Sequence, residues 1–253
     1  MNKVVMITGA TAGIGEACAY KFAAEGWDVI ITGRRKERLE ALEDQLRLDH
    51  KVDIRSLCFD VRDLKVVREQ IRGLEGKWKE VSVLVNNAGL AVGTGPFHEG
   101  VYDDWERMID TNLKGLIYIT RELAPIMVEN GRGHIINIAS MAGHEVYPGG
   151  NVYCATKHAV LALTKGMRMD MVGQNIRVSA VSPGAVETEF SIVRYKGDVQ
   201  RATDKYNGYD PLTGADVAES VYFVASQPEH INIQEVYLAP KAQASQYVLK
   251  KNN

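Results

Sequence analysis

Cysteine and long apolar runs are scarce in this chain. Its three cysteines, Cys18, Cys58 and Cys154, lie far apart and match neither a disulfide framework nor a CxxC metal clip. No run of about 20 apolar residues occurs, and the apolar N-terminal stretch before Gly9 is too short for a secretory signal. We therefore expect a cytoplasmic protein with no metal site and no membrane partner.

An excess of positive charge is also absent. Lysine and arginine number 30 against 32 for aspartate and glutamate, so the formal net charge is -2. This balance provides no strongly basic surface to select nucleic acid or anionic membranes. Hydrophobic residues make up 45% and charged residues 25%, which is typical of a soluble folded domain. We expect neither nucleic acid nor a membrane as a partner.

Short apolar segments alternate with longer amphipathic ones. The predicted strands cover residues 4–8, 29–32, 54–59, 81–86, 134–139, 176–182 and 234–239. The predicted helices include residues 37–48, 65–74, 105–127 and 152–171. Continuous apolar strands indicate a sheet covered on both faces, and the alternation of strands and helices indicates parallel strands. The predicted fold class is α/β, a doubly wound parallel sheet of seven strands in a single domain over residues 1–253.

The segment from about residue 187 to 211 interrupts this regular pattern. It is polar and irregular, with Gly197, Gly208 and Pro211 as breaks, and it follows a predicted strand. Long loops in compact domains are usually functional or mobile, and doubly wound sheets place their sites at strand ends. We predict a substrate loop here, which could act as a lid.

The first predicted strand runs into the sequence TGATAGIG, which an amphipathic helix follows. Gly9, Gly13 and Gly15 stand in a G-x-x-x-G-x-G spacing. Glycines at a strand-to-helix turn allow a pyrophosphate to approach the N–H groups at the helix N-terminus. The turn is interpreted as a dinucleotide site; the alternative is a tight turn without a ligand.

Two arginines follow the second predicted strand, in the sequence Thr32-Gly33-Arg34-Arg35. An NAD enzyme usually places an acidic residue there to bind the ribose 2′-hydroxyl, and this chain has none. Guanidinium groups suit a 2′-phosphate because they pair with phosphate through charge-assisted hydrogen bonds. The sequence therefore predicts NADP(H) rather than NAD(H), unless the arginines are solvated charges beside the next helix.

Polar residues also follow the third and fourth predicted strands. Asp60 could accept a hydrogen bond from the adenine amino group, and Asn87, Ala88 and Gly89 could line the adenosine ribose. Taken alone, either Asp60 or Asn87 is also consistent with an ordinary turn residue.

Ser140 ends the fifth predicted strand, and Tyr153 and Lys157 lie one helical turn apart in the next helix. Reduction of a carbonyl by hydride needs a proton donor and hydrogen bonds to the developing alkoxide. Tyrosine has an ordinary pKa of about 10, but a neighbouring ammonium, together with oxidised nicotinamide, favours the phenolate. Ser140 and Tyr153 are therefore the predicted hydrogen-bonding pair, and Lys157 also suits the nicotinamide ribose. A tyrosine in the core beside a solvated lysine is the alternative for the pair alone.

Asn112 is a polar residue in the otherwise apolar helix segment DTNLKG. Two interpretations stay open from the sequence: its side chain holds a water that relays protons to Lys157, or it satisfies a kink in the helix.

From Val4 to about Ala239, the chain resembles the short-chain dehydrogenase/reductase family. The resemblance rests on motifs that occur in the family's order: TGATAGIG, NNAG, Asn112, Ser140, YCATK and the SPG of 182–184. The resemblance implies a Rossmann-type fold, catalysis by Asn112, Ser140, Tyr153 and Lys157, and frequently a homotetramer. It also implies that Pro183, Gly184 and Thr188 flank the nicotinamide. The full set of expected cofactor contacts is Gly9, Thr11, Ala12, Gly13, Ile14, Gly15, Arg34, Arg35, Asp60, Val61, Asn87, Ala88, Gly89, Tyr153, Lys157, Pro183, Gly184, Val186 and Thr188.

Within the family, ITGRRKERLE, GNVYCATK and TEFSIVRYKGD resemble the NADP-dependent 3-hydroxy acid dehydrogenases, which act on serine, allo-threonine and related acids. An acidic substrate needs a cation, and Arg194 in the predicted substrate loop is the candidate clamp. Tyr147 is the candidate for an opposing wall of the substrate site. The alternatives are that Arg194 is a solvated loop charge and that Tyr147 is a packing residue. The other hypotheses are a reductase of a neutral ketone or 3-oxoacyl thioester, and a non-catalytic NADP-binding regulator, which would not need Ser140, Tyr153 and Lys157.

Overall fold

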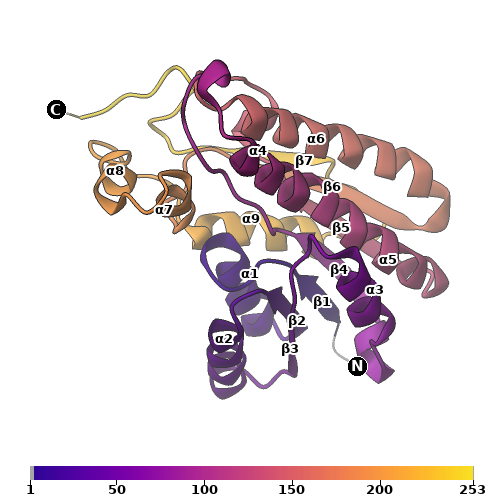
Figure 1. Ribbon diagram of the computed structural model, residues 1–253. Coiled ribbons are helices and arrows are strands. Elements are labelled where there is room, and N and C mark those ends of the chain that lie inside the picture. The colour runs from indigo at the N-terminus through magenta and orange to yellow at the C-terminus, as the bar shows by residue number, and fades with distance from the viewer. Residues whose placement is uncertain (1–2, 253) are drawn as a thin grey trace.

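The seven apolar segments form the seven strands of one sheet, in the order β3-β2-β1-β4-β5-β6-β7 (Figure 1). This computed structural model describes residues 3–252. All neighbouring strands are parallel, as predicted. The strands are β1 Val4–Ile7, β2 Asp28–Gly33, β3 Ile54–Cys58, β4 Val81–Asn86, β5 Gly133–Ile138, β6 Ile176–Pro183 and β7 Glu235–Leu238.

Helices cover both faces of the sheet (Figure 1). They are α1 Gly13–Ala24, α2 Lys36–Asp49, α3 Leu64–Arg72, α4 Tyr102–Ile109, α5 Leu116–Glu129, α6 Asn151–Met171, α7 Phe190–Arg194, α8 Val199–Asp204 and α9 Gly214–Ser226. Helices α1, α2 and α9 pack on one face, and α3 to α6 pack on the other. Within residues 3–252, no helix is long and apolar enough to cross a membrane.

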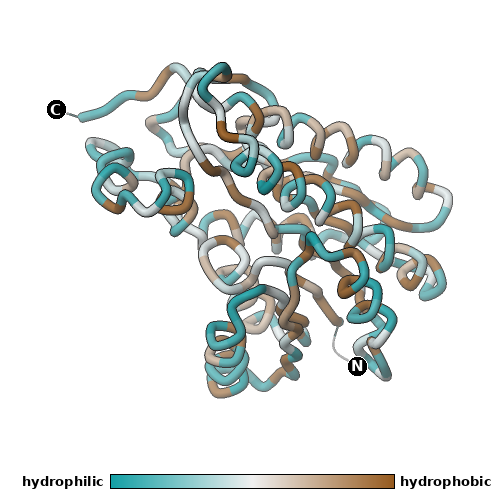
Figure 2. Tube along the Cα trace, viewed as in Figure 1, coloured by the Kyte–Doolittle hydropathy of each residue, from teal (hydrophilic) through white to brown (hydrophobic). Residues whose placement is uncertain are grey.

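Successive residues of each central strand enter two separate cores. Val5 and Ile7 of β1 pack under α1 and α9, whereas Val4 and Met6 pack under α3 and α5. Figure 2 shows the hydrophobic colour along the strands of the central sheet and the hydrophilic colour on the outer helices. This two-sided burial explains why the strands are continuously apolar rather than alternating.

The predicted helix over 105–127 is interrupted in the structure. Its first part is α4, its last part is α5, and Asp110–Gly115 between them forms a π-helical turn. Asn112 lies in this turn and bonds to the backbone of Leu90, so a side-chain interaction accompanies the local change of helix type. Residue periodicity could not distinguish this wide turn from a regular helix.

The predicted substrate loop is more ordered than its composition indicates. It contains the two short helices α7 and α8, which project from the rest of the fold in Figure 1. Asp198 caps α8 by accepting from the Arg201 N–H at 3.0 Å. At its base, an isolated bridge pairs Val186 with Leu212. The two ends of the segment therefore lie side by side.

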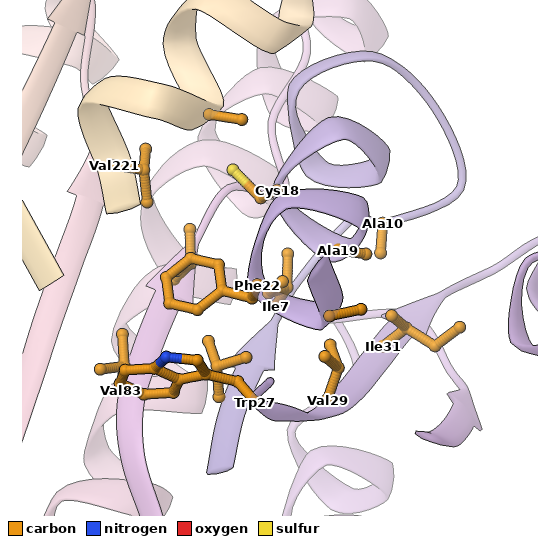
Figure 3. Close-up of a cluster of buried hydrophobic side chains, with 14 of the residues drawn as sticks. Ile7, Ala10, Cys18, Ala19, Phe22, Trp27, Val29, Ile31, Val83 and Val221 are labelled. Carbon is orange, nitrogen blue, oxygen red and sulfur yellow. The ribbon is translucent and has the colours of Figure 1, made fainter. Parts of the chain in front are cut away.

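One aromatic cluster closes the core beneath α1 (Figure 3). The rings of Phe22 and Trp27 meet edge to face at 5.2 Å between centroids, and Tyr222 of α9 approaches Phe22 at 5.4 Å. Phe22 is fully buried. Its side chain therefore joins α1 to both the sheet and α9.

Replacing Phe22 by alanine should lower the free energy of unfolding by about 3–5 kcal/mol, because it leaves a cavity and removes two aromatic contacts. Phe22→Leu, which keeps most of the volume, should cost less. Urea denaturation followed by circular dichroism measures both. A loss below about 1 kcal/mol for the alanine variant would contradict the packing described.

Candidate active site

The carboxyl ends of the central strands border one cleft of about 850 Å³. Its lining runs from the β1–α1 turn, past the ends of β4 and β5, to α6, the segment with α7 and α8, and the C-terminal tail. All of the site residues predicted from the sequence line this cleft except Gly15 and Asn112. The parallel topology therefore brings residues from most of the chain to one place.

The glycine turn has the shape that a phosphate site requires. Gly13 has φ +59°, a left-handed conformation, and Ala12 and Ile14 line the cleft beside it. Ala12 is the N-cap of α1, and no side chain caps the helix there, so its first-turn N–H groups are available to an anion. Gly15 lies behind the turn: a Cβ there would be 2.4 Å from Asn87 Nδ2. Gly15 therefore serves close packing.

Asn87 lines the cleft, and its side chain also stabilises the glycine-rich turn after β1. Its Nδ2 donates to the carbonyl oxygens of Thr8 at 2.8 Å and Gly9 at 3.1 Å. The Thr8 hydroxyl in turn accepts from the N–H groups of Asn87 and Ala88 at 3.0 Å. These bonds join the end of β4 to the end of β1.

The arginines after β2 face the cleft but are already paired. Arg35 donates to Thr11 Oγ1 at 2.8 Å and to Glu189 Oε2 at 2.9 Å. Arg38 donates to the same carboxylate at 2.8 Å. Hydrogen bonds from Arg35 and Arg38 lower the pKa of Glu189. Arg38 and Glu189 were not predicted, and the separation of 154 residues between Arg35 and Glu189 leaves no local signal.

Asp60 is held by arginines as well. Arg62 donates to both of its carboxylate oxygens, at 2.7 Å in the shortest contact, and Arg34 lies 3.5 Å away. Partial burial opposes ionisation, but hydrogen bonds from Arg62 lower the pKa of Asp60 overall. The adenine contact proposed for Asp60 therefore competes with arginine contacts, and it stays a prediction.

Ser140, Tyr153 and Lys157 converge on the cleft from β5 and α6. Ser140 Oγ accepts from the Ala142 N–H at 3.1 Å, which fixes the hydroxyl just beyond β5. Lys157 Nζ donates to the Ile138 carbonyl oxygen at 2.7 Å, and Tyr153 lies one turn earlier on α6. All three side chains are buried, and all three residues line the cleft. The predicted constellation is therefore assembled.

The electrostatics of this group are set by burial. Burial raises the pKa of Tyr153 above its ordinary value, whereas hydrogen bonding with Ser140 acts in the opposite direction. Burial lowers the pKa of Lys157 to about 8. The lowered tyrosine pKa expected from the sequence depended on a charged lysine and on oxidised nicotinamide. In the protein alone, the phenol is neutral at pH 7.

Asn112 is satisfied by protein groups. Its Oδ1 accepts from the Leu90 N–H at 2.8 Å, and its Nδ2 donates to the Leu90 carbonyl at 2.8 Å and to Thr156 Oγ1 at 3.1 Å. The side chain therefore supports the kink interpretation. A role for Asn112 in proton relay stays a hypothesis.

Arg194 and Tyr147 lie in contact at the far end of the cleft. Arg194 Nη1 donates to the Tyr147 hydroxyl at 2.9 Å, and the guanidinium lies 5.2 Å from the ring centroid. Tyr147 therefore lies beside Arg194 rather than opposite it, and its role as a wall of the substrate site stays a prediction. Arg194 Nε is buried without a hydrogen-bond partner. Within residues 3–252, no carboxylate pairs with Arg194.

The C-terminal tail completes the lining in a way that the sequence did not indicate. Gln243, Gln246 and Leu249 border the cleft. Gln243 Oε1 accepts from the Ala185 N–H at 2.8 Å, so the tail is tied to the turn after β6. No motif in the tail identified this contact.

Comparison with known proteins identifies the family of this chain. The model of the short chain dehydrogenase family matches residues 3–197. An NADP-dependent 3-hydroxy acid dehydrogenase from Salmonella typhi is 48% identical over 242 residues, 95% of this chain and 96% of the relative. A serine 3-dehydrogenase from Rhizobium radiobacter is 42% identical over 244 residues, 96% of each chain.

A solved structure of the closed form of serine dehydrogenase complexed with NADP+ superimposes with a TM-score of 0.93 at 43% sequence identity. It covers 99% of this chain and 100% of its own chain. The family match covers most of the sequence, and these relatives match over nearly their full length. The chain therefore belongs to the short-chain dehydrogenase family.

Proposed function

We propose that this protein interconverts a small 3-hydroxy acid and its 3-oxo acid or semialdehyde, using NADP(H) and Tyr153 as the acid–base group. One observation carries the proposal: Ser140 and Tyr153 share a cleft with Arg194, a partly buried residue whose Nε has no hydrogen-bond partner and whose guanidinium has no carboxylate partner among the described residues. The relatives named for 3-hydroxy acids and for serine support the substrate class.

The cofactor is NADP(H), and the cleft fits it. Ala12, Gly13 and Ile14 at the uncapped N-terminus of α1 would hold the pyrophosphate. Arg34 and Arg35 line the cleft after β2 and would hold the 2′-phosphate. When bound, the cofactor would supply the hydride chemistry, exchanging a hydride with the carbon that carries the substrate hydroxyl.

The protein's own part is proton transfer. In reduction, the neutral Tyr153 phenol donates a proton to the developing alkoxide, and its raised pKa keeps it protonated for this role. In oxidation, its phenolate takes the proton from the substrate hydroxyl. Ser140 donates a hydrogen bond to the same oxygen. The Lys157 ammonium favours the phenolate; with a pKa of about 8, its charge is present at pH 7 and is lost as the pH rises further.

Arg194 would orient the acid. A guanidinium with an unsatisfied buried Nε is set up to bind a carboxylate through charge-assisted hydrogen bonds, which are strong where water is excluded. Its position at the end of α7 places it on the predicted substrate loop, whose residues line the cleft. Phe190 on the same helix packs against Tyr153, with 5.7 Å between ring centroids.

A cytoplasmic homotetramer belongs to the same proposal. Its support is the family resemblance, together with an edge strand, β7, on which Tyr237 is 47% exposed. An exposed strand edge with an aromatic residue is a surface that another copy of the chain can cover.

Replacing Tyr153 by phenylalanine should lower kcat for NADP+-dependent oxidation of 3-hydroxypropionate by about 10²–10⁴-fold, because the proton acceptor is lost. Tight NADPH binding should persist, since the ring and its packing remain. Stopped-flow absorbance and fluorescence titration measure the two quantities. Unchanged kcat in a folded variant would eliminate the proposed acid–base group.

Replacing Arg194 by methionine should raise the KM for 3-hydroxypropionate at least about tenfold with a smaller change in kcat, because a buried charge-assisted contact is lost. Arg194→Lys should restore part of the affinity, and exposed Arg132→Met is the matched control. Turnover of 1-propanol, a neutral alcohol of the same length, should not respond. An unchanged KM for the acid would exclude the clamp.

Replacing Arg35 by glutamine should raise the KM for NADP+ about tenfold or more while the KM for NAD+ changes much less, because only NADP+ carries the 2′-phosphate. Lys36→Gln is the matched control, since Lys36 is the exposed neighbour and does not line the cleft. Equal changes for both cofactors would contradict the assignment of Arg35.

A further inference from the structure

A second partly buried cation, the ammonium of Lys205, lines the cleft just after α8. Its Nζ lies 5.3 Å from the centroid of the Tyr206 ring. Among the described residues, no carboxylate pairs with it. Lysine is rarely buried without a partner, because removing an ammonium from water is costly.

The groups around Lys205 make this end of the cleft positive. Arg194 faces it from α7, Arg201 lies on α8, and Lys251 donates to the Lys205 carbonyl oxygen from the C-terminal tail at 3.4 Å. Arg201 lies 4.6 Å from the Tyr195 ring, and no carboxylate in residues 3–252 pairs with it.

The acidic groups nearby form no ion pair with Lys205. Asp204 also lines the cleft, but it is exposed to solvent, and the contacts that it accepts come from Gln200 and Asn207 at 2.9 and 3.0 Å. Glu187 is exposed and lies outside the cleft lining. Burial, and then the charge of Arg194, lower the pKa of Lys205 to about 8. An anion bound beside Lys205 would offset both the cost of burying its ammonium and its repulsion from Arg194.

We propose that Lys205 is a second cation for the substrate carboxylate, acting with Arg194, and that it makes the site prefer 3-hydroxy acids without a 2-ammonium group over serine-type amino acids. This inference rests on the proposed function and refines its substrate class. In an amino acid, the ammonium is on the carbon next to the carboxylate. It therefore meets two like charges, and no buried, unpaired carboxylate lines the described cleft to accept it.

The test uses 3-hydroxypropionate and L-serine, which differ only in the 2-ammonium group. In Lys205→Met, the KM for 3-hydroxypropionate with NADP+ should rise about tenfold, while kcat changes less than about twofold. For serine, loss of the attraction between Lys205 and the carboxylate is offset by loss of the repulsion between Lys205 and the 2-ammonium group. The ratio of the two kcat/KM values should therefore fall about fivefold. Lys205→Arg should keep the wild-type ratio, and exposed Lys51→Met is the matched control.

The pH dependence gives a second readout. The ammonium of Lys205 is lost as the pH rises through about 8, so the KM for 3-hydroxypropionate should rise between pH 7 and 9. Lys157 titrates in the same pH range in the wild type and in Lys205→Met. The KM should therefore rise more steeply with pH in the wild type, and the difference between the two proteins measures the contribution of Lys205. Burial raises the pKa values of Tyr206 and Tyr209, which keeps both neutral in this range.

The possible failures are distinguishable. If no 3-hydroxy acid is oxidised, or if Arg194→Met leaves the KM unchanged, the proposed function fails. If acid oxidation depends on Arg194 but Lys205→Met leaves the KM and the substrate ratio at wild-type values, only the role of Lys205 is overturned. In the folded Lys205→Met variant, kcat/KM for 1-propanol could fall as far as kcat/KM for 3-hydroxypropionate. That result would likewise overturn the role of Lys205, because a purely structural lysine would affect both substrates equally.

Discussion

The hydrogen bond from Lys157 to the Ile138 carbonyl oxygen holds the site together. It joins the interior of α6 to the end of β5, and it thereby sets Tyr153 against Ser140. A buried ammonium that bonds to a backbone carbonyl keeps only part of its hydration energy, which is why its pKa falls. The positive charge is therefore present at neutral pH, but a modest rise in pH removes it. Chemistry that moves a proton to and fro benefits from such a poised group.

The two halves of the cleft have different electrostatics. Near the ends of β2 and β3, the arginines are paired with carboxylates, among them Glu189 and Asp60. Near α7 and α8, the cations of Arg194 and Lys205 have no such partners among the described residues. A paired arginine can exchange one anion for another at modest cost, whereas an unpaired buried cation favours an incoming anion directly. The first end suits the phosphates of NADP(H), and the second suits the acid that we propose as substrate.

The sequence predicted those features that depend on local pattern. Two-sided burial makes the strands continuously apolar, so the seven strands and their parallel direction could be inferred. The glycine turn and the Tyr153–Lys157 spacing are local motifs. Contacts between distant segments could not be predicted. Glu189, just before α7, meets Arg35, just before α2, across 154 residues of sequence, and Tyr147 lies beside Arg194 across 47 residues. The π-helical turn was missed because its residues keep helical periodicity while a side-chain contact at Asn112 accompanies the change in helix type.

The bridge between Val186 and Leu212 has a mechanical consequence. Since both ends of the intervening stretch are fastened at the same point, α7 and α8 belong to one closed excursion of the chain. A single pairing of backbone segments therefore fixes where this excursion leaves and rejoins the fold beside the cleft.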